Sequence, residues 1–172
     1  MRYAHLIAAL LLVFVLYGVA FIENCSQCDK KNFESSGVVP VEARMRCLVD
    51  QLKRNISDNE TREIFQCALR DWQHRDGAAG FAISDALLDM MEANPKLFFA
   101  MMASDQTSFN SWLQSLPALS FTWHGKPPSP LEKKRRHFIK LLKEIGELQG
   151  DAEELRGRLQ ATLQRIKVRQ IE

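Results

Sequence analysis

Two cysteines spaced three positions apart, Cys25 and Cys28, form the pattern closest to a catalytic motif in this chain. Thiol–disulfide enzymes use this spacing because a helix N-terminus lowers the pKa of the first thiol. Here the pair lies in a polar stretch, with no predicted strand before it and no apolar helix directly after it. We therefore favour a structural disulfide, and keep a redox protein using Cys25 and Cys28 as an alternative.

Cys47 and Cys67 complete an even count of four cysteines, which in an exported chain predicts two disulfide bonds. If a helical hairpin turns near Ser57, each lies ten residues from the turn. They would then be level on neighbouring helices, with Cα atoms about 6 Å apart, within bridging range. We predict a Cys47–Cys67 bond and a local Cys25–Cys28 pair. The alternative cross-links the linker to the hairpin, and a zinc site is less favoured.

Other residue types with chemical potential have simpler explanations. Methionines 90, 91, 101 and 102 fall at core-facing positions, so we interpret them as core filler rather than copper ligands. Asp85, Asp89 and Glu92 share one face of a predicted helix, which a solvated outer face explains equally well. The four histidines are scattered, and no nucleophile elbow, phosphate loop or His-Glu-x-x-His motif occurs. We expect no catalytic residue, no metal and no cofactor, so an enzyme is the less favoured class.

A basic amphipathic stretch covers residues 133–143. Such helices bind anionic lipid surfaces or acidic partners through charge and an apolar face. We favour a different interpretation, because the apolar stripe continues well past the basic block: the stripe is a packing seam and the charges solvate it. The candidate membrane or acidic-partner contacts are Lys133, Lys134, Arg135, Arg136, Lys140 and Lys143.

The beginning of the chain predicts membrane engagement. Residues 6–22 form an apolar run without charges after Arg2, and Gly18 and Ala20 would suit a signal peptidase. Residues 1–22 are therefore a signal peptide or a signal anchor with the N-terminus inside. The remainder is expected to be extracytoplasmic, either membrane-anchored by a single pass or secreted or periplasmic. Candidate glycosylation sites are Asn24, Asn55 and Asn59, although turn-forming asparagines would look the same.

Helical periodicity organises the rest of the chain and predicts an all-α fold. A polar linker with the CxxC pair covers 23–40, and a helical domain of about five short helices covers 41–124. The first two helices are expected over about 41–54 and 59–75. Asn94 with Pro95 and Ser104 or Asp105 mark later helix starts. Leu119 to Trp123 is at most one isolated extended segment.

The C-terminal part is expected to be a long amphipathic helix. A Pro-rich linker covers 125–129, and Ser129 to Glu132 combines a capping box with proline at the first helical position. Apolar residues then keep a 3-4 spacing over 130–172, which predicts a helix able to form a coiled coil. Gly150 and Asp151 would permit a hairpin, but the unbroken phase favours one continuous helix.

Composition bounds the function without identifying it. The chain has 172 residues, 26% of them charged, and a net charge of +2. This balance and the expected compartment argue against nucleic acid as a partner. We expect a non-catalytic interaction or assembly protein. Its partners would be another protein or a second copy through the C-terminal helix, and the membrane through residues 6–22 if the leader is uncleaved.

Overall fold

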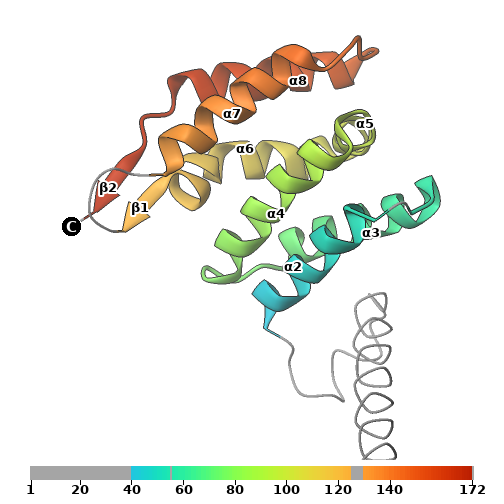
Figure 1. Cartoon of the computed structure of the whole chain (residues 1–172), viewed down its shortest axis with the longest axis horizontal. Helices are drawn as coiled ribbons and strands as arrows, with labels where there is room; N and C mark the ends of the chain where they lie inside the picture. Colours follow the sequence, from blue (N-terminus) through green and yellow to red (C-terminus); the bar gives the residue numbers. More distant parts are fainter. Residues whose placement is uncertain (1–39, 55, 125–129, 172) are drawn as a thin grey trace, which may run out of the picture. The chain divides into compact units, whose positions relative to one another are not determined.

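The computed structural model of the chain describes residues 40–54, 56–124 and 130–171. These residues form seven α-helices and two short β-strands, which confirms the predicted all-α class (Figure 1). Val41–Glu172 makes up one compact unit. The elements are α2 (Val41–Leu52), α3 (Asp58–Gln73), α4 (Ala79–Ala93), α5 (Pro95–Ser104), α6 (Gln106–Ser120), β1 (Thr122–His124), α7 (Leu131–Glu144), α8 (Asp151–Arg165) and β2 (Arg169–Ile171).

Side-chain caps set the starts of three of the central helices. A capping box begins α3, where the Ser57 hydroxyl accepts the Glu60 N–H and the Glu60 carboxylate accepts the Ser57 N–H. The helix therefore begins one residue before the expected range of about 59–75. Asn94 caps α5 by accepting the Leu97 N–H at 3.2 Å, and Asp105 caps α6 in the same way, as expected.

Aromatic rings and methionines fill the core between α3, α4, α5 and α6. The Phe98 ring meets the rings of Phe65, Phe99 and Trp112 edge-on, with centroids 6.3, 5.3 and 5.7 Å away. Such T-shaped pairs place a positive ring edge against a negative ring face, which adds to the gain from burial. Methionines 45, 90, 91 and 102 are at most 2% exposed, as predicted for core filler, and Met101 is half-buried.

The C-terminal segment is a helical hairpin, so the prediction of one continuous helix is wrong. The first arm, α7, ends at Glu144, and Gly150 adopts a φ of 56° directly before α8 begins. This left-handed conformation suits glycine because it has no Cβ. The apolar residues keep the same 3-4 spacing on both sides of the break because each arm buries its apolar side against the preceding helices. Buried stripe residues are Phe138, Leu142, Leu155, Leu159 and Leu163.

Two three-residue strands close the end of the unit. The first, β1, pairs in parallel with β2, with Thr122 opposite Arg169 and His124 opposite Ile171 (Figure 1). The expected extended segment is thus displaced by a few residues and is not isolated. Its partner strand was missed because helix was expected there, and three residues are too few to show an alternating pattern.

Several predictions fall outside the described residues: the leader, the polar linker with its CxxC pair, the Pro-rich linker, Asn24 and Asn55. None of the described helices combines the length and the apolar character that crossing a bilayer requires.

Candidate interaction site

The first arm of the C-terminal hairpin, α7, divides its cations between the body and solvent. Phe138 and Leu142 on its inner side are 2% and 0% exposed, so the apolar face of the predicted amphipathic helix is already covered within the chain. Lys134 and Arg135 lie at its edges and are half-buried. The apolar face is therefore not available for insertion into a bilayer in this fold.

The two charged patterns that the sequence shows separately meet in the structure. The Lys134 Nζ lies 2.8 Å from Asp85 Oδ1, and the His137 Nε2 lies 2.9 Å from Glu92 Oε1. Two of the three carboxylates on the outer face of α4, Asp85 and Glu92, thus have partners on α7, which sequence reasoning did not identify. Because these side chains are 24–50% exposed, each pair contributes at most about 1 kcal/mol. They link α7 to α4 at two positions.

Glu132 holds the start of α7 together. Its carboxylate accepts two hydrogen bonds from Arg135, at 2.7 and 3.0 Å, and one from Arg136 at 3.0 Å. These charge-assisted bonds lower the pKa of Glu132 to about 2. Arg135 also donates to the backbone carbonyl of Leu163 at 2.9 Å, so it ties α7 to the end of α8. Arg135 thus makes structural contacts within the chain, and its predicted contact with a partner stays a prediction.

The remaining cations of α7 face solvent and continue onto the second arm. Lys133, Arg136, Lys140 and Lys143 recur every three or four residues and are all exposed, so they share one side of the helix. Arg165, Lys167 and Arg169, at and after the end of α8, are also exposed. We call these seven residues the cationic face. Among the described residues, only Arg136 and Lys140 of this set form ion pairs, with Glu132 and Glu144.

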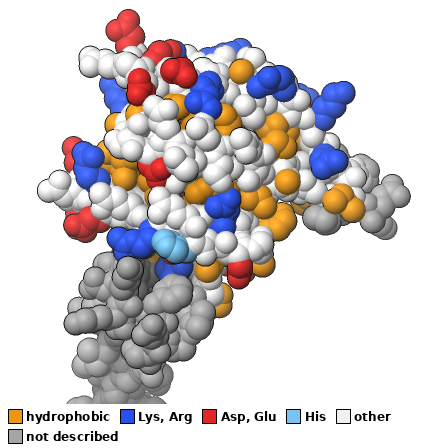
Figure 2. Space-filling view, turned by 180° about the vertical axis from the view of Figure 1, so that it is seen from behind, with side chains coloured by type: hydrophobic (Ala, Val, Ile, Leu, Met, Phe, Trp, Pro, Cys, Tyr) orange, Lys and Arg blue, Asp and Glu red, His pale blue; other side chains and the backbone are white. Residues whose placement is uncertain are grey.

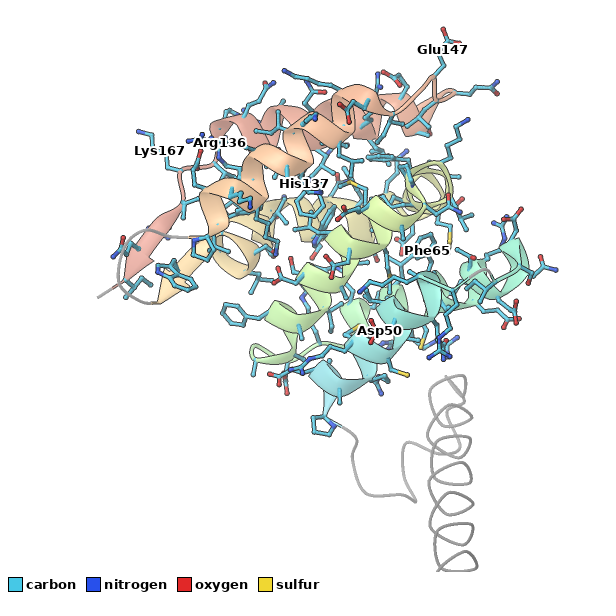
Figure 3. All side chains as sticks on the ribbon, viewed as in Figure 1. Asp50, Phe65, Arg136, His137, Glu147 and Lys167 are labelled. Carbon is cyan, nitrogen blue, oxygen red and sulfur yellow. The ribbon has the colours of Figure 1, made fainter. Side chains whose placement is uncertain are left out.

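The hairpin has opposite charges at its two ends. Arg136 and Lys167 lie at the end near the strands, and Glu147 projects from the turn at the other end (Figure 3). Figure 2 shows the same division from behind, with acidic side chains gathered at the upper left and basic ones along the upper right. Arg165, Lys167 and Arg169 were missed in the sequence because α8 was expected to continue past them. Their charge was visible, but their position beside α7 depends on the hairpin.

The other predicted sites are less informative. Cys67 is 4% exposed and Cys47 is half-buried, and neither is a free thiol. No disulfide joins two of the described residues, so the predicted Cys47–Cys67 bond is not found there. A bond from either cysteine to the linker stays a prediction, as does the redox role of Cys25 and Cys28. Asn59 is exposed in the first turn of α3.

In the described part of the chain, no group of three or more His, Cys, Asp or Glu side chains is arranged to hold a metal ion. Comparisons of the chain with protein-family models, with curated proteins and with solved structures find no match.

Proposed function

We propose that this chain is a non-catalytic, extracytoplasmic interaction protein, membrane-tethered or secreted, whose cationic face docks an acidic surface of a partner protein. The observation that carries the proposal is the division of charge on α7. Its apolar side and the half-buried Lys134 and Arg135 contact other elements of the chain, whereas Lys133, Arg136, Lys140 and Lys143 are exposed beside three more cations.

The position of these cations in the helix supports a role in binding. The first two turns of α7 contain Lys133, Lys134, Arg135 and Arg136, at the end where the helix dipole is positive. Each cation at this end destabilises the helix by about 0.3–1 kcal/mol. Acidic residues at the same end stabilise a helix, and the first turn of α8 has them. Of these four cations, only Lys133 forms no ion pair among the described residues, and a residue that opposes local stability without a compensating contact is expected where a surface serves a function.

A photo-crosslinking experiment in cells tests this proposal. A photoreactive amino acid replaces Lys143 in the exported protein, and crosslinked products are resolved by mass. We expect a discrete protein adduct that disappears when Lys133, Lys140 and Lys167 are changed together to Gln.

The matched control removes three exposed cations elsewhere, by changing Arg54, Arg62 and Lys96 to Gln. Both triple variants change the net charge equally, so loss of the adduct in both would indicate a general charge effect. An adduct that survives removal of the cationic-face residues would refute this face as the docking surface.

A second candidate, an anionic bilayer surface, is favoured by the apolar run at residues 6–22 of the same chain. A protein held at a membrane brings its cations within reach of acidic headgroups, each cation contributing about 1 kcal/mol. Initial association rates with phosphatidylcholine vesicles, with and without phosphatidylglycerol, separate the two. Faster association with vesicles that contain phosphatidylglycerol, lost in the cationic-face variant but kept in its control, would support the lipid surface. Equal association rates with the two kinds of vesicle would exclude it.

A further inference from the structure

An open groove runs between α2 and α4, on residues other than those of the cationic face. Its volume is about 560 Å³, within the range of about 300–1,000 Å³ typical of binding clefts. Its floor is apolar, since Met45, Val49 and Ala86 line it and are 2–7% exposed. Asp50, labelled on α2 in Figure 3, lies on one wall.

An exposed aromatic ring lies at one end of this α2/α4 groove. Phe81, near the start of α4, is 47% exposed, and among the described residues only Ile171 is a comparably exposed large apolar side chain. A folded chain normally buries phenylalanine, because burial of such a ring gains about 1.5–3 kcal/mol. Together with the buried apolar floor beside it, its ring offers this end of the groove an apolar contact for a ligand.

Two carboxylates of α4 line the groove further along the helix, and the basic side chains of Arg46 and Lys53 also line it. Asp85 and Asp89 follow Phe81 at intervals of four residues, so the three form one stripe along α4. Asp85 is paired with Lys134, and Asp50 across the groove is paired with Lys53 at 3.2 Å. The side chains of Glu42 and Asp89 line the groove without a hydrogen bond or ion pair within the described ranges of the chain, and of these two acids Asp89 is the one on the stripe with Phe81.

The surroundings of Asp89 favour a cationic ligand. Burial raises its pKa, and the charges of Asp85 and Glu92 raise it further, while the positive charges of Lys134 and Lys53 act in the opposite direction. A carboxylate in such a position gains more from an incoming cation than one that already has a partner. The charge is thus complementary to lysine or arginine.

We propose that the α2/α4 groove binds a basic segment of a partner protein, with a Lys or Arg side chain on Asp89 and an apolar side chain on Phe81. Eight residues separate the two positions, which along a helix is about 12 Å. An extended segment of about four residues covers this distance. Because the groove is open along its length, a continuous chain fits it better than a small molecule, which would remain largely exposed.

A titration with a synthetic peptide tests the proposal on the exported full-length protein. The probe is a labelled five-residue peptide, blocked at both ends, with leucine first, two alanines and two lysines last. The comparison peptide has glutamates in place of the lysines. By fluorescence anisotropy we expect the basic peptide to bind at least about tenfold more tightly.

Two substitutions locate the binding and two others control for it. Asp89→Asn and Phe81→Ser should each weaken binding of the basic peptide about fivefold. Glu63→Gln removes an exposed acid from α3, and Ile171→Ser removes the other exposed apolar side chain; both should leave binding unchanged. All four positions are exposed, so circular dichroism should show folded proteins in every case.

Three outcomes overturn the proposal. The first is equal binding of the two peptides, and the second is unchanged binding after Asp89→Asn or Phe81→Ser. The third is displacement of the peptide by butylamine at equal concentration, which would assign the groove to small amines. Loss of the crosslink at the cationic face would leave each of these results unaffected, because the two experiments use different residues.

Discussion

At the scale of single residues, a buried polar network links α4 to α6. The Trp112 Nε1–H donates to Ser84 Oγ at 3.1 Å, and the Ser84 and Ser120 hydroxyls lie 2.8 Å apart. All three side chains are at most 3% exposed, so each polar atom depends on the others for a partner. Ser84 is the central member because it contacts both neighbours.

Replacement of Ser84 by Ala should therefore destabilise the protein more than an ordinary serine deletion. The indole N–H would lose its acceptor and Ser120 its side-chain partner among the described residues, which costs about 1–3 kcal/mol in a buried site. Urea unfolding measures the difference. Ser115→Ala is the matched control, because its hydroxyl bonds only to the carbonyl of Ser111 in its own helix. Equal effects of the two substitutions would show that the network contributes little.

A second residue-scale prediction concerns pH and Glu132. Its folded-state pKa of about 2 lies below the ordinary value of 4.5, so its contribution to stability is complete above pH 4.5 and is lost as pH falls towards 2. Glu132→Gln should lower the free energy of unfolding at pH 7 by about 0.5 kcal/mol, the range of partly exposed pairs. The two proteins should converge near pH 2. Chemical denaturation at several pH values checks this, with Glu147→Gln as the exposed control.

The sequence predicted correctly those side chains that cap the helix directly after them. Asn94 and Asp105 cap the helices that follow them, and their partners lie three residues away in both cases. It failed for Lys134 with Asp85, which are 49 residues apart and meet only through the packing of α7 on α4. Local capping is encoded in spacing, whereas the candidate site depends on how helices are placed.

At the scale of elements, the C-terminal hairpin shows where helical periodicity is ambiguous. The 3-4 spacing of apolar residues predicts which side of a helix is buried. It does not show whether two segments with the same spacing belong to one continuous helix or to two separate helices. Here the backbone leaves the helix at Ile145, whose ψ is 124°, and returns through Gly150. Glycines at 146 and 150 each weaken a helix by about 1 kcal/mol, and packing of both arms on the body exceeds what a continuous helix would gain.

Three glycine substitutions distinguish a hairpin from a continuous helix. Gly150→Ala should destabilise the protein by about 1 kcal/mol, because its positive φ is strained for any residue with a Cβ. Gly157→Ala, inside α8 with open space around its Cα, should stabilise it by up to about 1 kcal/mol. Gly146→Ala, in the turn with ordinary φ, should have a small effect. Thermal unfolding measures all three, and stabilisation by Gly150→Ala would contradict the hairpin.

At the scale of the whole molecule, the question is whether the hairpin and the five preceding helices unfold together. The second arm packs against α5, and polar contacts join it to α6 through Gln106 with Asp151 and through Arg158 with Asn110. The Arg158 guanidinium also lies 5.5 Å from the centre of the Phe109 ring. Charge pairs tie α7 to α4 on the other side. These contacts make the hairpin part of one core rather than an appendage.

One buried leucine in the hairpin tests this unity. Leu159 in α8 is 0% exposed, so Leu159→Ala should cost about 2–5 kcal/mol through lost burial and the cavity left behind. If the unit unfolds cooperatively, the substitution should accelerate amide hydrogen exchange by the same factor in α4 as in α8, even though no residue of α4 is changed. Gln160→Ala, at the neighbouring half-buried position, should leave both unchanged. Faster exchange confined to α7 and α8 would mean that the hairpin opens by itself. The cationic face would then belong to a detachable arm, and its apolar stripe could reach a partner only in that opened state.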